Sequence, residues 1–232
     1  MLCALPGIRS REAQSLRIEF SYDPPPGPPV ILHLDDRLIV VDKPAGLLSV
    51  PGKLEGRADC LITRLQAVYP DALVVHRLDC DTSGLILFAR DKAAQGHLGQ
   101  EFEQRRAKKS YLARVQGLVA SDSGTVDLPL SVDWPNRPRQ MVNHQDGKHA
   151  HTDWQVISRS ETETRMRLFP LTGRSHQLRV HMLAIGHPIL GDQIYAPETL
   201  ADHSRLMLHA ETLGLHYPGT GEWVQFAAPC PF

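Results

Sequence analysis

Short apolar runs separated by polar or Gly/Pro-containing turns dominate the chain from Val30 onward, a pattern typical of β-strands. The run VILHL at 30–34 is followed by a turn at Asp35 and Asp36 and then by LIVVDKP at 38–44, which predicts a β-hairpin. Further strand candidates are LVVHRL at 73–78, LILFAR at 85–90, SYLARVQG at 110–117, TDWQVIS at 152–158, TRMRLFPL at 164–171, RLMLHAETLGLHY at 205–217 and EWVQF at 222–226.

Two stretches in the first half of the chain carry apolar residues at helical spacing. Residues 59–69 predict an amphipathic helix with Asp59 as its N-cap. Residues 91–106 predict a second helix with a charged outer face, in which Glu101 and Arg105 can pair across one turn. Both helices are expected to pack one face on a core.

The predicted strands outnumber the helices, and no repeated strand–helix–strand rhythm is present. We therefore expect an α+β fold with a mixed, mainly antiparallel β-sheet core and flanking helices. Residues 1–29 end in the proline cluster DPPPGPP and are expected to form a flexible tail. Residues 30–232 are expected to form one folded domain.

Composition limits the classes of function that fit. The 25 Lys and Arg residues nearly balance 26 Asp and Glu residues, so any contact with nucleic acid must come from local basic patches rather than from net charge. The four cysteines, which contain no CxxC pair, favour a reducing cytoplasm over a disulfide framework. No signal peptide and no apolar stretch of about 18 residues is present, so we expect a cytoplasmic protein that is not embedded in a membrane.

The densest candidate chemistry lies in HRLDCDTSGLILFA at 76–89, where three function classes compete. A calcium loop is excluded because its twelfth position, which needs a glutamate, is Arg90. A magnesium-dependent phosphohydrolase needs a later acidic cluster, and Asp192 is the lone candidate. This second class is therefore only weakly supported.

The third class follows from a resemblance, because this segment closely resembles the HRLDxxTSG signature of the RluA-type pseudouridine synthases. Three other segments resemble motifs of the same family in the same order: VDKPAGLLSVPG at 41–52, KKSYLARVQG at 108–117 and LTGRSHQLRVHMLAIGHPILGD at 171–192. The resemblance extends from residue 30 to the C-terminus and includes LPLSVDWPNRPRQ at 128–140. Since only 29 residues precede the first strand, we expect no N-terminal S4-like RNA-binding domain.

The resemblance implies three catalytic residues, Asp79, Tyr111 and Arg179. Asp79 matches the family's catalytic aspartate and must be ionised to act as a nucleophile or base. Tyr111 is expected to pack on the flipped uracil. The predicted helix at about 174–185 is apolar on more than one side, so its Arg179 needs a buried partner, which we expect to be Asp79.

The resemblance also implies RNA as the partner, with the dual-specificity members of the family acting on the anticodon stem-loop of tRNA and on a stem-loop of 23S rRNA. Arg77 is expected to enter the RNA in place of the flipped base. Trp134 beside Arg137 and Arg139 offers stacking together with charge. The full set of expected RNA-binding residues is His76, Arg77, Lys43, Lys108, Lys109, Trp134, Arg137, Arg139 and Arg174.

The 12 histidines raise the question of a metal site. His176 and His181 are five residues apart and so point to different faces of a helix. His144, His149 and His151 lie in a polar segment and are interpreted as solvated loop residues. We therefore expect no metal and no cofactor. No protein partner is implied, and a monomer is the default. The alternative function is a catalytically inactive RNA stem-loop binder.

Overall fold

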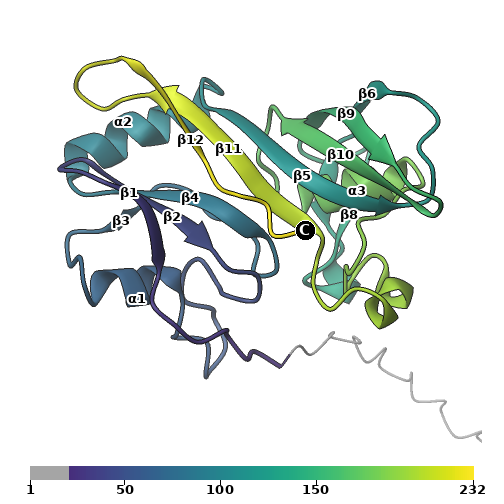
Figure 1. The fold of residues 1–232 in the computed structure, drawn as a ribbon, viewed down its shortest axis with the longest axis horizontal. Coiled ribbons are helices and arrows are strands. Elements are labelled where there is room, and N and C mark those ends of the chain that lie inside the picture. The colour runs from purple at the N-terminus through teal and green to yellow at the C-terminus, as the bar shows by residue number, and fades with distance from the viewer. Residues whose placement is uncertain (1–20) are drawn as a thin grey trace, which may run out of the picture.

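The computed structural model describes residues 21–232, whose centre is a ten-stranded sheet with the strand order β1-β2-β4-β11-β5-β10-β9-β6 (Figure 1). Two strands lie off this path, because β3 pairs with β4 and β12 pairs with β11. The strands of this sheet are β1 (Val30–Leu34), β2 (Leu38–Lys43), β3 (Leu73–Val74), β4 (Ser83–Ala89), β5 (Lys108–Gln116), β6 (Ser123–Asp127), β9 (His151–Arg159), β10 (Glu163–Pro170), β11 (Leu208–His216) and β12 (Trp223–Ala227). Among these strands only β4 and β11 pair in parallel, so the predicted mainly antiparallel α+β fold is confirmed.

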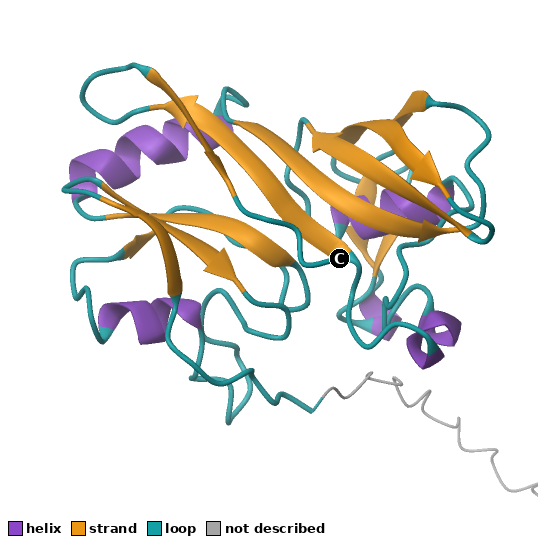
Figure 2. Ribbon diagram, in the orientation of Figure 1, coloured by secondary structure: helices purple, strands orange, loops and turns teal. Residues whose placement is uncertain are grey.

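The remaining elements lie around this sheet. A separate two-stranded sheet joins β7 (Leu130–Val132) to β8 (Gln140–Val142), and the helices are α1 (Leu61–Gln66), α2 (Lys92–Glu103), α3 (Gln177–Ala184) and the 3-10 helices η1 (Trp134–Asn136) and η2 (Pro197–Ala201). Figure 2 shows that α1 and α2 lie with the β1–β4 half of the sheet, whereas α3 lies with the other half. None of the described helices is long and apolar enough to cross a membrane.

Each half of the sheet has its own buried cluster. The first cluster includes the fully buried strand residues 38–41 and 86–89 together with apolar residues of α1 and α2. The second cluster joins β5 and β10 to Leu178 and Met182 of α3. Tyr111 on β5 packs against both clusters, so it lies where the two halves meet.

The two halves are joined where β4 runs beside β11. Ser83 pairs with His209 and Gly84 with Ala210 in the parallel register. Gly84 has a φ of +103°, and a Cβ atom at this position would lie 2.3 Å from the carbonyl oxygen of Ala210. The glycine that follows Thr82 and Ser83 is therefore required by both backbone conformation and close approach.

The helix boundaries differ from the predicted ones. Cys60, not Asp59, is the N-cap of α1, since its N–H donates to Thr63 Oγ1 at 3.0 Å, while Asp59 forms an ion pair with Arg64. The first helix also ends at Gln66, three residues earlier than expected.

The predicted pairing of Glu101 with Arg105 is wrong. Arg105 has a left-handed φ of 59° just after α2 ends, so its side chain leaves the helical position that pairing requires. Glu101 is buried and instead pairs with Arg106 at 2.5 Å and with His216 at 2.9 Å. The second helix runs from Lys92 to Glu103, three residues short of the predicted end at 106, and its N-cap is Asp91, whose side chain accepts from the N–H of Ala94.

The proline-rich stretch before β1 lies partly inside the described residues. The hydroxyl of Tyr22 donates to the carbonyl of Asp59 at 2.7 Å. Arg64 of α1 donates to the carbonyls of Pro25 and Gly27. The part from 22 to 27 is thus attached beside α1, and the rest of the predicted flexible tail, 1–20, lies outside the described residues.

Candidate active site

A cavity of about 1120 Å³ lies where the two halves of the sheet meet. It is lined by the loop 74–82 that precedes β4, by Lys109 and Tyr111 of β5, and by the segment 170–179 that leads into α3. The three sequence motifs that carry the expected catalytic residues therefore converge on one cavity.

Asp79 projects from a loop whose backbone is fixed on both sides. Ser49 Oγ donates to the carbonyl of Leu78 at 2.8 Å and accepts from its N–H at 3.1 Å. On the other side, the carbonyl of Cys80 accepts from Lys43 Nζ at 2.8 Å and from the N–H of Gly46 at 3.0 Å. The carboxylate itself remains 32% exposed, so a substrate in the cavity can reach it.

Arg179 lies on α3 with 3% of its side chain exposed. Its Nη1 atom is 3.9 Å from Asp79 Oδ2, but its Nε and Nη2 atoms each donate to a carboxylate oxygen of Asp192 at 2.6 Å. The expectation that Asp79 is its main partner is therefore corrected. Asp192 holds the guanidinium through two short hydrogen bonds, and only Nη1 faces Asp79, at the longer distance.

Asp192 is fully buried and has a structural reason for its position. Besides Arg179, its Oδ1 atom accepts from the backbone N–H groups of Ile194 and Tyr195 at 2.9 and 3.1 Å. Burial alone would lower the pKa of Arg179, but the hydrogen bonds and charge of Asp192, with the charge of Asp79, raise it above its ordinary value. The guanidinium is thus a fixed cation beside Asp79.

Tyr111 faces the same cavity from β5. Burial, followed by the negative charge of Asp79, raises the pKa of its phenol above the ordinary value. Tyr111 therefore presents a neutral hydroxyl and an aromatic ring to the cavity, at the junction of the two buried clusters.

Tyr195 and His176 lie in the same group of contacting side chains as Arg179, although the sequence analysis did not identify them as site residues. The ring of Tyr195 lies 5.1 Å from the guanidinium carbon of Arg179, and its hydroxyl is 2.9 Å from His176 Nδ1. Their segments lack regular periodicity, so no pattern marked them. Asp192 could have been found, since a buried arginine needs a carboxylate and Asp192 is the nearest acid after the helix.

Three of the expected RNA-binding residues line the cavity as exposed or partly exposed cations. Arg77 lies beside Asp79 in the loop, Arg174 lies before α3, and Lys109 lies on β5. Burial lowers the pKa of Lys109 to about 8. Lys108 is exposed on β5 but is not part of the cavity wall.

Lys43, an expected RNA-binding residue, is not positioned to contact an RNA phosphate. Lys43 is 0% exposed, and its Nζ donates to the carbonyls of Pro44, Leu47 and Cys80 at 2.7–2.9 Å. It lies at the end of a buried strand, and its side chain points into the protein.

His76 does line the cavity, but its imidazole is engaged by the protein. Its Nε2 atom accepts from the N–H of Leu87 at 3.2 Å, and its ring stacks on Phe102 with centroids 4.6 Å apart. Burial, and then the charge of Lys109, lowers the pKa of His76 to about 3. A neutral, stacked imidazole supports the wall and carries no charge for RNA.

The loop with the sequence WPNRPR lies between β7 and β8 and reaches the cavity through Pro138. Trp134 is 66% exposed, and the guanidinium carbon of Arg137 lies 4.5 Å from its ring centroid. Arg139 instead turns inward, with its guanidinium carbon 5.0 Å from the ring of Tyr195 and a hydrogen bond to the carbonyl of Ile194. The loop thus presents a stacked Trp–Arg pair to solvent and is fastened by Arg139.

Comparisons with known proteins agree with this geometry. The family model described as RNA pseudouridylate synthase matches residues 37–184. The dual-specificity RNA pseudouridine synthase RluA of Escherichia coli (strain K12) is 53% identical over 215 residues, which cover 91% of this chain and 98% of that protein. The protein of the same name from Pasteurella multocida (strain Pm70) is 49% identical over the same shares of the two chains.

The fold is shared with a solved relative. Human RNA Pseudouridylate Synthase Domain Containing 1 has a TM-score of 0.73 and 30% sequence identity, with 90% of this chain and 87% of that chain covered. The family match includes the loop with Asp79, strand β5 with Tyr111 and the helix with Arg179. The chain therefore belongs to the RNA pseudouridylate synthase family.

Proposed function

We propose that this protein isomerises uridine to pseudouridine in two structured RNAs, the anticodon stem-loop of tRNA and a stem-loop of 23S rRNA. The observation that carries the proposal is the meeting of Asp79, Tyr111 and Arg179 in one cavity of about 1120 Å³. A cavity of this size accommodates a flipped nucleotide. The dual-specificity relatives, which match nearly their whole length, support more than one RNA substrate.

The reaction changes only the attachment of the base. The bond between C1′ and N1 breaks, the uracil turns, and C1′ bonds to C5, after which the C5 proton is lost and N1 gains one. Asp79 supplies the carboxylate that assists cleavage, as a nucleophile or as a base. Arg179, 3.9 Å away and fixed by Asp192, keeps a positive charge beside it throughout the reaction.

The other cavity residues position the nucleotide. Tyr111 presents its ring to the flipped uracil and its neutral hydroxyl toward the C5 proton. Arg77, exposed beside Asp79, is placed to fill the gap that the flipped base leaves in the RNA. Lys109 and Arg174, which both line the cavity, offer positive charge to phosphates of the RNA strand.

The direct test uses in vitro transcribed tRNA and fragments of 23S rRNA, incubated with the protein in EDTA. Pseudouridine is then mapped by carbodiimide treatment and primer extension. We expect conversion in an anticodon loop and in one rRNA loop. Conversion of neither RNA while both are bound would contradict the proposal and favour the non-catalytic binder.

Asp79→Asn gives the matched control, since the amide keeps the shape of the side chain and removes its charge. We expect turnover to fall below detection, while the dissociation constant for RNA stays within about tenfold of the wild-type value. Turnover that survives this substitution would exclude the carboxylate mechanism.

We further propose that the protein acts in the cytoplasm as a monomer. Cys60, Cys80 and Cys230 are free thiols, as expected of a reducing compartment. Light scattering after gel filtration tests the monomer, and a mass of about 52 kDa instead of the 25.8 kDa of one chain would contradict it.

A further inference from the structure

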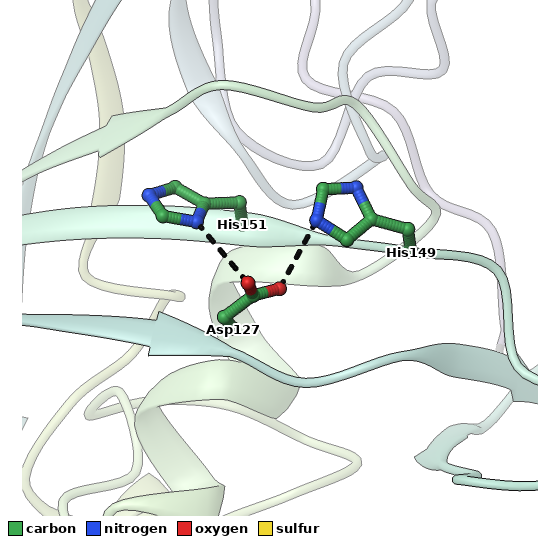
Figure 3. Close-up of side chains that lie close together, drawn as sticks. All are labelled: Asp127, His149 and His151. Carbon is green, nitrogen blue, oxygen red and sulfur yellow. Dashed lines mark ion pairs between the residues drawn. The ribbon is translucent and has the colours of Figure 1, made fainter.

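A group of metal-ligating side chains lies on the edge of the sheet, outside the cavity. His151 begins β9, His149 precedes it by two residues, and Asp127 ends the neighbouring edge strand β6. Asp127 and His151 are directly opposite each other in the antiparallel register. Since residues two apart on an extended chain share a face, the three side chains meet on one face (Figure 3).

The carboxylate of Asp127 lies between the two imidazoles. His149 Nε2 is 3.1 Å from Asp127 Oδ1, and His151 Nδ1 is 3.7 Å from Asp127 Oδ2 (Figure 3). One ligand atom from each of the three residues lies within 4.8 Å of the others. Metal bonds of about 2.1 Å place the ligand atoms of a tetrahedral site roughly 3.4 Å apart, so small side-chain rotations suffice to close the group around an ion.

His151 is also oriented by a residue outside this group. Its Nε2 atom lies 3.1 Å from Asp153 Oδ1, and that same oxygen accepts from the Thr125 hydroxyl at 2.6 Å. A hydrogen bond from Nε2–H to a carboxylate fixes the tautomer whose Nδ1 carries the free lone pair. This arrangement of carboxylate, histidine and ligand atom is typical of metal-binding histidines.

From this geometry we propose that Asp127, His149 and His151 form a binding site for a divalent transition-metal ion of the zinc class. Two imidazole nitrogens and one carboxylate oxygen suit zinc or nickel, whereas magnesium and calcium prefer oxygen ligands alone. His149 is 52% and Asp127 55% exposed, so water completes the coordination sphere. The sequence interpretation treated these histidines as solvated because they lie in a polar segment, and it did not identify Asp127, which β6 brings beside them.

The site has a structural role, because it ties the edge strand β6 to β9 at a point close to the cavity wall. The carbonyl of His149 accepts from Arg174 Nε at 3.0 Å, and Arg174 lines the cavity. A bound ion therefore restrains the backbone that supports Arg174. The isomerisation itself does not use the ion, so activity in EDTA and metal binding are separate observations.

The test is a calorimetric titration of the whole protein with zinc chloride, in a buffer that contains no competing chelator. We expect one equivalent of zinc to bind to the wild type, and binding at this site to be lost in His149→Ala. Asp153→Asn, which removes the orienting carboxylate, should weaken the same site about 10–100-fold. Magnesium chloride should give no binding at the same concentrations.

His144→Ala provides the matched control, because His144 is an exposed histidine in the same segment and outside the group. It should bind zinc as the wild type does. A zinc stoichiometry that is unchanged in His149→Ala, or equal losses in His149→Ala and His144→Ala, would overturn the proposal. A rise in melting temperature with zinc, seen in the wild type and absent from His149→Ala, would support it independently.

Discussion

Lys43 illustrates at the residue scale how a buried charge organises the active site. An ammonium group has three hydrogens, and the Nζ of Lys43 finds three carbonyl acceptors, those of Pro44, Leu47 and Cys80. Burial lowers the pKa of Lys43 to about 8, and the nearby negative charges of Asp81 and Asp79 act against this lowering. The lysine thus joins the loop after β2 to the backbone that follows Asp79.

Replacing this lysine should therefore affect stability and turnover together. Lys43→Met keeps the length of the side chain but removes the ammonium donor from the carbonyls of Pro44, Leu47 and Cys80, of which Cys80 keeps the N–H of Gly46. We therefore expect a loss of about 3 kcal/mol in the free energy of unfolding. Turnover should fall more than RNA affinity, because the Cys80 carbonyl next to Asp79 loses one of its two donors. Urea unfolding and single-turnover kinetics check these effects, and Lys53→Met, at an exposed lysine, should stay within about 0.5 kcal/mol of the wild type.

His76 should make the protein sensitive to acid. Its pKa is about 3 in the folded chain and about 6.5 in an unfolded one, so below pH 6.5 the unfolded state binds a proton that the folded state does not. As the pH falls from 6.5 toward 3, this group alone should lower the free energy of unfolding by about 1.4 kcal/mol per pH unit. His76→Gln retains an acceptor for the N–H of Leu87 and does not titrate.

Urea unfolding between pH 5 and 6.5 gives the measurement for His76. We expect the plot of stability against pH to be steeper for the wild type than for His76→Gln by about one proton. Equal slopes for the two proteins would show that His76 takes up a proton in the folded state, contrary to its buried, stacked position.

The residues of the active site differ in how far the sequence could identify them. Asp79, Tyr111 and Arg179 could be singled out because they lie in recognisable motifs, and all three line the cavity. Lys43 was assigned to RNA only as one of the basic residues of the chain, whereas the structure buries its side chain completely. The pairing of Arg179 with Asp192 could have been inferred, because a buried arginine needs a carboxylate and Asp192 is the first acidic residue after α3.

At the element scale, glycines in β4 and α2 should respond to substitution in opposite directions. Gly84→Ala would place a methyl group 2.3 Å from the carbonyl oxygen of Ala210 at a φ of +103°, so we expect a loss of about 3 kcal/mol or more. Gly96 lies inside α2 with no atom within 4 Å of the position of an added Cβ. Gly96→Ala should therefore stabilise the protein by about 0.5–1 kcal/mol.

Thermal and urea unfolding of the two alanine variants check this prediction. The comparison is informative because each variant adds the same methyl group, so the difference reports the surroundings and the backbone conformation of the two positions. If Gly96→Ala destabilised the protein as much as Gly84→Ala does, the prediction that the two substitutions act in opposite directions would be wrong. Failure of Gly84→Ala to accumulate as a folded protein agrees with the prediction.

The elements that the sequence predicted are those with a clear pattern of apolar residues. Strands β2 and β4 are nearly continuous apolar runs, and both were expected. The edge strand β6 has the sequence SGTVD and a burial pattern with a single buried residue, so it carries no strand signal of its own. It forms because β9 offers it an unpaired edge, and this tertiary effect is also what brings Asp127 to the two histidines.

The whole molecule has a net charge of −1, yet it presents positive charge around one cavity. Arg77, Lys109 and Arg174 line the walls, and the exposed pair of Trp134 and Arg137 lies on a loop whose Pro138 reaches the same cavity. A chain without a global cationic field should therefore bind RNA through a few local phosphate contacts. Its affinity should fall with salt according to the number of those contacts.

Substitutions at the cavity should separate the charge contribution from the stacking contribution to RNA binding. Arg174→Ala removes one phosphate contact, so the slope of log K against log salt should become shallower by about 1. Trp134→Ala removes a stacking surface without changing charge, so affinity should fall while the slope stays the same. Fluorescence anisotropy with a labelled anticodon stem-loop between about 50 and 200 mM salt gives both quantities. Arg37 is a cation that does not line the cavity, so Arg37→Ala should leave both the RNA affinity and the salt slope unchanged. If the slope also became shallower in this control, RNA binding would depend on the net charge of the protein and not on contacts at the cavity.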